Sequence, residues 1–403
     1  MKHFKITISI LVLAFVIGCA PQEKPEKPLS EVINQSLAFA QQQSLLMAQS
    51  LEDQPSRLPK TINQQGELET CGSEWWVSGF FPGVLWYLYE NSNDEKLKAW
   101  ATNYTLRVED QQYTTDNHDV GFMIFCSFGH AYRLTNNEAY RDVIETASQS
   151  LITRFNPTVG CIRSWDEAPW SKQWEFPVII DNMMNLEMLM WAGKTFDNPE
   201  FTKVAEAHAN TTMKHHFRED FSSYHVVSYD TLTGEPEAKH TSQGYSHESA
   251  WARGQAWGLY GYVMMYREWG NQDYLKQAVR IADFILNHPN LPDDKIPYWD
   301  FDAPDIPDAL RDASAGAIIC SALIELSDYV SGQKSADYLA VAEKQLRTLS
   351  SPEYLAKPGK NGNFILKHSV GHMPNGTEVD VPLSYADYYY VEALMRMKKR
   401  KGL

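Results

Sequence analysis

Two aspartates about sixty residues apart are the residues of this chain best placed to do chemistry. Asp119 stands in the run HDVGF and Asp181 in the run IIDNMMNL. Each precedes or opens an apolar segment that predicts a helix, so each carboxyl group would lie at a helix N-terminus. A carboxyl group there can take part in catalysis, or it can cap the free N–H groups of the first turn. For either residue taken alone, capping is the better-supported interpretation.

Clusters of aromatic, charged and glycine residues recur ahead of the other apolar helical segments. They occupy residues 75–80, 118–119, 181–182, 251–257, 312–314 and 385–387. If these helices run in the same direction, the clusters line one mouth, where N-terminal dipoles favour an anion. Tryptophan beside arginine and aspartate suits a sugar ring that carries a carboxylate, although burial in the core is the competing interpretation for any single tryptophan. Arg253 is expected to contact the anion, with a structural ion pair as the alternative.

Helical segments of two kinds must position these groups. Five amphipathic segments each open with a capping residue three positions before a bulky apolar residue, and the caps are Asp94, Asn137, Asn198, Asn271 and Ser335. Six nearly all-apolar segments alternate with them, at about 79–91, 120–135, 180–196, 249–269, 312–331 and 384–398. With an opening helix near 30–52, the segments make twelve helices.

The alternation of the two kinds of helix predicts an outer and an inner ring. The fold expected is therefore all-α, an (α/α)6 barrel of six helical hairpins. A solenoid of stacked hairpins is the alternative architecture. The barrel is favoured because the unusual residues all gather at the same end of the apolar helices. Strand signals are weak and local, as at residues 225–229.

The N-terminal segment predicts export and lipid attachment. Residues 1–18 indicate a signal peptide, since lysines precede an apolar run too short to span a membrane. Cys19 directly follows Gly18 at the end of that run and is the predicted lipidation site, with an ordinary cleaved signal as the alternative. Residues 19–29 hold three prolines and predict a tether that does not pack. Residues 30–403 then form a single domain, lipid-anchored in the periplasm or at the outer membrane.

Charge and cysteine content exclude several classes of protein. Removing residues 1–18 lowers the basic residues from 36 to 34 against 51 acidic ones, a formal net charge of −17. Such a surface argues against nucleic acid and anionic lipid as partners. None of the five cysteines has zinc-type spacing, so no metal is expected, and a disulfide between Cys71 and Cys161 is an open alternative outside the cytoplasm.

The motifs HDVGF, IIDNMMNL and WARGQAW together resemble glycoside hydrolase family 88, the unsaturated glucuronyl hydrolases. The resemblance covers nearly the whole chain after the tether, from Trp76 to about residue 388. It implies the same six-hairpin barrel, Asp181 as general acid/base and Asp119 as a second essential aspartate. It also implies a set of sugar-contacting positions, namely Trp76, His118, His225, Gln243, Arg253 and Trp257.

Two further segments border the implied site. The loop 239–245 precedes the WARGQAW helix and adds Lys239 and Thr241 as substrate-binding candidates. The segment 367–372 resembles another loop of the family's site and adds His372. Lys239 and His372 are candidates for a sulfate contact, with ordinary solvation as the alternative for the lysine. The resemblance implies no metal and no organic cofactor.

The family acts on the 4,5-unsaturated uronic acid that polysaccharide lyases leave at the non-reducing end of their products. An acid protonates C4, water adds at C5, and the resulting hemiketal opens and releases the remaining saccharide. Asp181 must be protonated to begin, so burial must raise its pKa above the ordinary ~3.9. Two alternatives stay open, the unsaturated rhamnogalacturonyl hydrolases and a lipoprotein that binds acidic oligosaccharides without catalysis.

Overall fold

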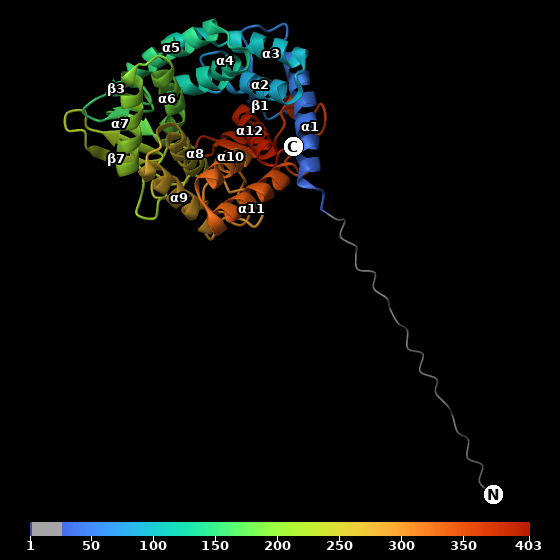
Figure 1. Cartoon of the computed structure of the whole chain (residues 1–403). Coiled ribbons are helices and arrows are strands. Elements are labelled where there is room, and N and C mark those ends of the chain that lie inside the picture. The colour runs from blue at the N-terminus through green and yellow to red at the C-terminus, as the bar shows by residue number, and fades with distance from the viewer. Residues whose placement is uncertain (2–25) are drawn as a thin grey trace.

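The computed structural model describes Met1 and residues 26–403. Apart from Met1, the predicted signal peptide lies outside these residues, as does Cys19. In the described part, twelve α-helices alternate between an outer and an inner ring (Figure 1). The outer helices are α1 (Leu29–Ser50), α3 (Glu95–Leu106), α5 (Glu138–Ile152), α7 (Pro199–His215), α9 (Gln272–Asn287) and α11 (Gly332–Leu349). The inner helices are α2 (Phe80–Ser92), α4 (His130–Thr135), α6 (Leu186–Thr195), α8 (Ala252–Trp269), α10 (Ala313–Tyr329) and α12 (Ser384–Arg400).

Two inner helices begin with turns of unusual geometry, and these are the helices that follow the two aspartates. The π-helix η2 (Gly121–Gly129) runs directly into α4. The 3-10 helix η3 (Ile180–Asn185) runs directly into α6. Segments of π-helix, and 3-10 turns inside helices, often mark functional places, so both places are candidates for a site.

The ring of helices closes on itself. The last inner helix, α12, packs against α10 and α2, and the first helix, α1, packs against both α2 and α12. A solenoid keeps its first and last hairpins apart, so these contacts identify an (α/α)6 barrel and confirm the predicted fold. Inner helices such as α10 are buried on nearly every side, whereas outer helices such as α9 bury one face. This difference explains the two sequence patterns.

Four of the five predicted helix caps are confirmed and one is wrong. The side chains of Asp94, Asn137, Asn198 and Asn271 each accept a backbone N–H two residues ahead. Ser335 instead lies inside α11, which already begins at Gly332. Its hydroxyl donates to the carbonyl of Ser327 in α10 at 2.7 Å, so it joins two helices and caps neither.

Nine short strands in the described residues connect the helices. They are β1 (Leu58–Ile62), β2 (Leu68–Cys71), β3 (Phe155–Asn156), β4 (Cys161–Ile162), β5 (Pro177–Ile179), β6 (Val226–Tyr229), β7 (Pro236–His240), β8 (Ser369–His372) and β9 (Thr377–Val381). The weak strand pattern at 225–229 corresponds to β6, the centre of the antiparallel sheet β5-β6-β7. This sheet joins the segment before η3 to the 239–245 loop, since Val226 pairs with both Ile179 and His240.

Two expectations about the chain's covalent and terminal organisation need correction. Cys71 and Cys161 are both free, buried thiols, so the disulfide alternative is wrong. The end of the predicted tether packs on the domain, because the carbonyl of Lys27 accepts a hydrogen bond from Arg347 of α11 at 2.7 Å. Pro28 is the N-cap of α1, so the first helix begins at Leu29. None of the helices in the described residues is both long and apolar enough to span a membrane.

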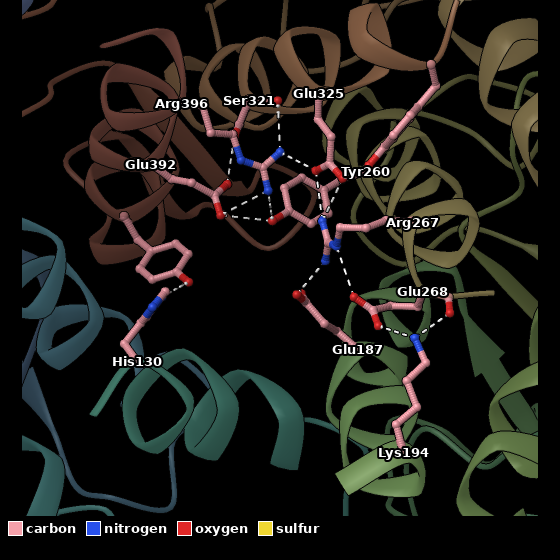
Figure 2. Close-up of polar contacts among 12 residues, drawn as sticks. His130, Glu187, Lys194, Tyr260, Arg267, Glu268, Ser321, Glu325, Glu392 and Arg396 are labelled. Carbon is pink, nitrogen blue, oxygen red and sulfur yellow. Dashed lines mark hydrogen bonds and ion pairs between the residues drawn. The ribbon is translucent and has the colours of Figure 1, made fainter. Parts of the chain in front are cut away.

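A continuous network of ion pairs joins the inner helices α6, α8, α10 and α12 (Figure 2). Arg267 of α8 contacts three carboxylates at 2.5–3.0 Å, those of Glu187, Glu268 and Glu325. Arg396 of α12 shares Glu325 at 2.7 Å and also pairs with Glu392 at 3.3 Å. Basic residues occupy the last turns of α4, α6, α8 and α12, where the helix dipole favours positive charge. The network therefore clamps one end of the barrel and leaves the opposite end for the unusual N-terminal clusters.

Candidate active site

The N-terminal ends of the inner helices meet at one end of the barrel, as the sequence predicts. The Trp76 ring, ahead of α2, lies 4.8 Å from the ring of Tyr385 in α12. The Arg253 guanidinium in α8 pairs with Asp312, the N-cap of α10, at 3.3 Å. The same guanidinium lies 5.4 Å from the Tyr385 ring. Four of the six clusters are thus in contact, and the two that contain Asp119 and Asp181 complete the mouth.

The first aspartate faces a buried histidine whose protonation the structure fixes. His118 Nδ1 lies 3.0 Å from the carbonyl oxygen of Ser164, so Nδ1 carries the hydrogen. The unprotonated Nε2 then faces Asp119 Oδ1 at 3.3 Å. Burial lowers the pKa of His118 to about 4 and raises that of Asp119 to about 7, although the positive charge of Arg154 opposes the second shift. Nε2 makes no hydrogen bond to the described residues at this distance, so His118 and Asp119 can both bind a ligand.

The second aspartate faces a histidine in the opposite tautomer. His225 Nδ1 accepts the backbone N–H groups of Ser242 at 3.0 Å and Gln243 at 3.2 Å, so the hydrogen is on Nε2, which lies 3.8 Å from Asp181 Oδ2. Burial lowers the pKa of His225 well below its ordinary value. Burial also raises the pKa of Asp181 to about 6, against the opposing charge of Arg253. Asp181 therefore holds its proton to much higher pH than an exposed aspartate, which suits a general acid.

The capping interpretation does not hold for these two residues. The N-cap positions of η2 and η3 are Val120 and Ile179, and neither aspartate accepts a backbone N–H of the following turn in the described structure. Asp181 Oδ2 is buried and has no hydrogen-bond partner among the described residues. By contrast, Asp312 does cap its helix, through the N–H of Ser314 at 2.9 Å. The two carboxyl groups are thus left available for a ligand.

Two asparagines in the second motif hold the first motif in place. Asn185 Oδ1 accepts the N–H of Phe122 at 2.9 Å, which is the start of the π-helix. Asn182 Nδ2 donates to Ser164 Oγ at 3.1 Å, and Ser164 in turn fixes the histidine beside the first aspartate. A Cβ atom at Gly121 would lie 2.7 Å from Asn185 Cα, so only glycine allows this approach. Sequence reasoning missed both asparagines, although they stand inside the motif IIDNMMNL.

Arg253 is more heavily engaged than the sequence predicts. Nη1 donates to the carbonyl of Val370 at 2.5 Å, and Nη2 donates to that of Gly371 at 2.7 Å. Nη1 also lies 3.3 Å from Asp312, while the buried Nε has no partner among the described residues. The guanidinium stacks 4.4 Å from the ring of Trp251. Arg253 thus anchors β8 at the mouth, and its contact with a substrate carboxylate stays a prediction.

Other predicted binding residues lie around this centre. Gln243 Nε2 donates to the carbonyl of Gly371 at 3.0 Å, which ties the 239–245 loop to β8. His372 lies close enough to Arg253 that this charge adds to burial in lowering the pKa of His372. Trp76 is partly exposed in the mouth. These three side chains lie at the same end of the barrel as the aspartates, and their contacts with substrate stay predictions.

Three of the proposed residues are placed differently. Lys239 lies over the Tyr224 ring, with its nitrogen 5.0 Å from the ring centre, and is not brought together with the two aspartates. Thr241 Oγ1 accepts the N–H of Gly244 at 2.8 Å and shapes the loop. Trp257 is fully buried, and its indole N–H has no partner among the described residues. The expected cluster at 385–387 is also only half in the mouth, because Asp387 accepts the N–H groups of residues 365 and 366 at 2.8 Å.

The family comparison agrees with this geometry. The family model of Glycosyl Hydrolase Family 88 matches residues 47–402. The chain belongs to this family.

Relatives of known name cover almost the entire chain. An unsaturated glucuronyl hydrolase of Formosa agariphila is 43% identical over 403 residues, with 98% of each chain covered. An unsaturated chondroitin disaccharide hydrolase of Streptococcus pyogenes is 32% identical over 397 residues, covering 95% of this chain and 97% of that protein. The crystal structure of an unsaturated glucuronyl hydrolase specific for heparin is 50% identical, with a TM-score of 0.90, and the match covers 93% of this chain and 99% of that chain.

In this family 88 chain a tryptophan cluster beside the mouth escaped sequence reasoning. The Trp165 ring lies 5.0 Å from that of Trp170, 5.8 Å from that of Trp174 and 6.3 Å from the imidazole of His225. The signal that could have found the cluster is the density of tryptophan in residues 165–174. Among the described residues, no group of three or more histidine, cysteine, aspartate or glutamate side chains could hold a metal ion.

Proposed function

We propose that this family 88 chain removes the 4,5-unsaturated uronic acid from the non-reducing end of oligosaccharides that polysaccharide lyases produce. One observation carries the proposal. Two buried carboxyl groups with raised pKa values, those of Asp119 and Asp181, lie at the N-terminal mouth of the barrel, and neither is used to cap a helix. A carboxyl group that keeps its proton near neutral pH can protonate a vinyl ether, which an ordinary aspartate does poorly.

The reaction begins when Asp181 gives its proton to C4 and positive charge develops at C5. The Asp181 carboxylate then takes a proton from a water molecule as the water oxygen bonds to C5. Ring opening turns the C5 hemiketal into a ketone and leaves a hemiacetal at C1, which releases the remaining saccharide as an alcohol. Asp119 and His118 hold sugar hydroxyl groups from the other side of the mouth. The reaction consumes one water molecule and regenerates Asp181.

The test follows the vinyl ether itself. The wild-type chain should remove the ultraviolet absorbance of a lyase-made disaccharide and release one saccharide for each chromophore lost. In D2O, NMR spectra of the earliest product should show deuterium on one face of C4, as enzymatic protonation requires. A chain that binds the disaccharide and leaves its absorbance intact is the non-catalytic oligosaccharide-binding protein that competes with this proposal.

The preferred glycan is the finer part of the proposal. Heparin-type disaccharides are the first choice, supported by the 50% identity to a hydrolase specific for heparin. Chondroitin-type disaccharides are the comparison, since the relative that acts on them is 32% identical. The ratio of kcat/KM for the two unsaturated disaccharides measures this preference. A ratio that favours the chondroitin-type substrate refutes the heparin assignment and leaves the hydrolase function intact.

The proposed place of action is the periplasm or the outer membrane, with the chain anchored by lipid at Cys19. The support is the sequence alone, an apolar run that ends in Gly18 followed by Cys19 and a proline-rich segment. The described fold begins at Leu29 with α1, about ten residues after Cys19. A tether of that length keeps the barrel close to the membrane surface, where lyase products would reach it.

A further inference from the structure

A large cavity of the described structure is lined by neither of the two aspartates. It has a volume of about 950 Å³ and is lined by residues of α2, α8 and α12 and by the segments that form η2, α4, η3 and α6. Its inner end reaches Phe122, whose ring also lies 5.3 Å from that of Trp257. An aromatic layer thus separates the cavity from the catalytic mouth. A ligand in the cavity would occupy a second site, which we call the basal cavity.

One wall of the basal cavity is aromatic. Phe125, Tyr132 and Trp191 all line it and all remain partly exposed. The Trp191 ring lies 5.8 Å from the Phe125 ring and 5.6 Å from the Tyr132 ring, so the three form one platform. Aromatic rings with one open side bind the apolar faces of sugar rings and leave the sugar hydroxyl groups free to hydrogen-bond.

The other wall is charged, but its arginines are already neutralised. Arg267 uses all of its nitrogens on carboxylates, and Arg396 is bound by Glu325 and Glu392, as Figure 2 shows. Arg133 holds both oxygens of Glu90 at 2.7 Å. No guanidinium of this wall is left for an incoming anion. The three guanidinium groups of this wall therefore give an incoming acidic ligand no partner.

A few polar groups of the cavity remain open. Only one oxygen of Glu187 is used, by Arg267, so the other can accept a hydrogen bond. The Tyr132 hydroxyl, the Trp191 indole N–H and the Lys399 amino group have no hydrogen-bond partner among the described residues. These groups supply donors and an acceptor, and the charge of Glu187 is already paired with Arg267. Such a set matches hydroxyl groups, which both donate and accept.

We propose that the basal cavity binds a neutral pyranose sugar, with its ring on the Trp191 platform and its hydroxyl groups directed to Glu187 and Tyr132. The volume is at the upper end of the range for small-ligand sites, roughly 300–1,000 Å³, so one or two sugar rings fit. The proposal does not depend on the hydrolase function. It assigns the two ends of the barrel different ligands, an acidic sugar at the mouth and a neutral sugar at the base.

Calorimetric titration of the wild-type chain with N-acetylglucosamine, glucose, glucosamine and glucuronate tests the proposal. The two neutral sugars should bind and glucuronate should bind at least about tenfold more weakly at this site, since its carboxylate finds no free guanidinium. Glu187→Gln keeps an acceptor and removes the negative charge. Neutral-sugar affinity should therefore stay within about twofold in this variant, whereas a site for cationic amino sugars would lose glucosamine.

Two matched tryptophan substitutions locate the site. Trp191→Leu should lower neutral-sugar affinity by about three- to tenfold, and Trp76→Leu at the catalytic mouth should leave it unchanged. Tyr132→Leu replaces Trp191→Leu if the latter does not fold. Hydrolase activity of the basal variants should stay within about twofold of wild type, because the aromatic layer separates the two sites. The proposal is overturned if the wild-type chain binds no neutral sugar. It is also overturned if Trp76→Leu loses neutral-sugar binding while Trp191→Leu keeps the wild-type affinity.

Discussion

Replacing Asp181 by asparagine should make the protein more stable at neutral and alkaline pH while it abolishes turnover. Asp181 is only 7% exposed, and burial raises its pKa from 3.8 to about 6. A carboxyl group whose folded pKa lies above its unfolded value binds more protons in the folded state. The free energy of unfolding therefore falls as pH rises from about 4 to about 6, and the full loss persists above that range. Asparagine does not ionise and escapes this loss.

The size of the effect follows from the pKa values. A shift of about two units corresponds to about 3 kcal/mol of unfolding free energy at pH 8. At pH 4.5 the same linkage leaves about 1 kcal/mol, because most folded molecules still carry the proton. For a domain of this size, 3 kcal/mol raises the melting temperature by about 4 °C. Asp181→Asn should thus gain about three times more stability at pH 8 than at pH 4.5.

Thermal melts at the two pH values and assays of the unsaturated disaccharide measure the two halves of this prediction. Loss of a general acid should lower the turnover rate by about 10² to 10⁴. Asp94→Asn is the control, since Asp94 is a surface N-cap that asparagine replaces equally well, and its melting temperature should not change at either pH. A variant at position 181 that is less stable at pH 8, or equally stabilised at both pH values, refutes the electrostatic reasoning. Normal turnover refutes the catalytic role.

Substitutions at four further positions test the rest of the site and the proposed lipid anchor. Burial raises the pKa of Asp119 to about 7, so Asp119 is largely uncharged where Asp181 titrates near 6; Asp119→Asn should therefore leave the alkaline limb of the kcat/KM profile in place, and a limb that moves to lower pH contradicts this. Asn185→Ala should lower kcat by about tenfold or more, because the first aspartate is then misplaced. Asn185→Asp keeps the hydrogen-bond acceptor and should recover most of the lost kcat. Equal kcat values in the two variants contradict the positioning role. Arg253→Lys should weaken substrate use by about ten- to a hundredfold, measured as kcat/KM, because lysine lacks the planar fork, and unchanged kinetics remove Arg253 from the site. Cys19→Ala should abolish incorporation of radioactive fatty acid, and label that persists in the variant excludes attachment at Cys19.

Local rules predicted the helices of the barrel and most of their starts. Asp94 and Asn271 cap helices because an exposed, short polar side chain just before an amphipathic helix can accept a free N–H group of the first turn. Ser335 satisfies the same pattern, but its hydroxyl finds the carbonyl of Ser327 in the neighbouring helix. Partners that are distant in the sequence decide such cases, and a single sequence does not contain them.

The candidate site was predicted in part for the same reason. Asp119 and Asp181 could be named from their motifs, and the meeting of the helix entrances followed from the ring of hairpins. The opposite tautomers of His118 and His225 depend on a carbonyl and two N–H groups in loops that only the folded chain brings together. Asp387 also stands near the start of an inner helix, as Asp119 and Asp181 do. Its carboxylate instead accepts backbone N–H groups of a loop, a contact that the sequence alone does not reveal.

Two opposing electrostatic effects act on the carboxyl groups at the mouth, and their magnitudes decide the outcome. The N-terminal dipoles of the inner helices favour ionised aspartate by about 0.3–1 kcal/mol, and by about 2 kcal/mol at most. Burial raises the pKa of Asp181 to about 6 and that of Asp119 to about 7. Shifts of about two to three units correspond to roughly 3–4 kcal/mol in the opposite direction, so burial prevails over the dipoles. A barrel of this architecture thus keeps an acid protonated near neutral pH by enclosing it, while the same dipoles remain available to attract the carboxylate of a uronic acid.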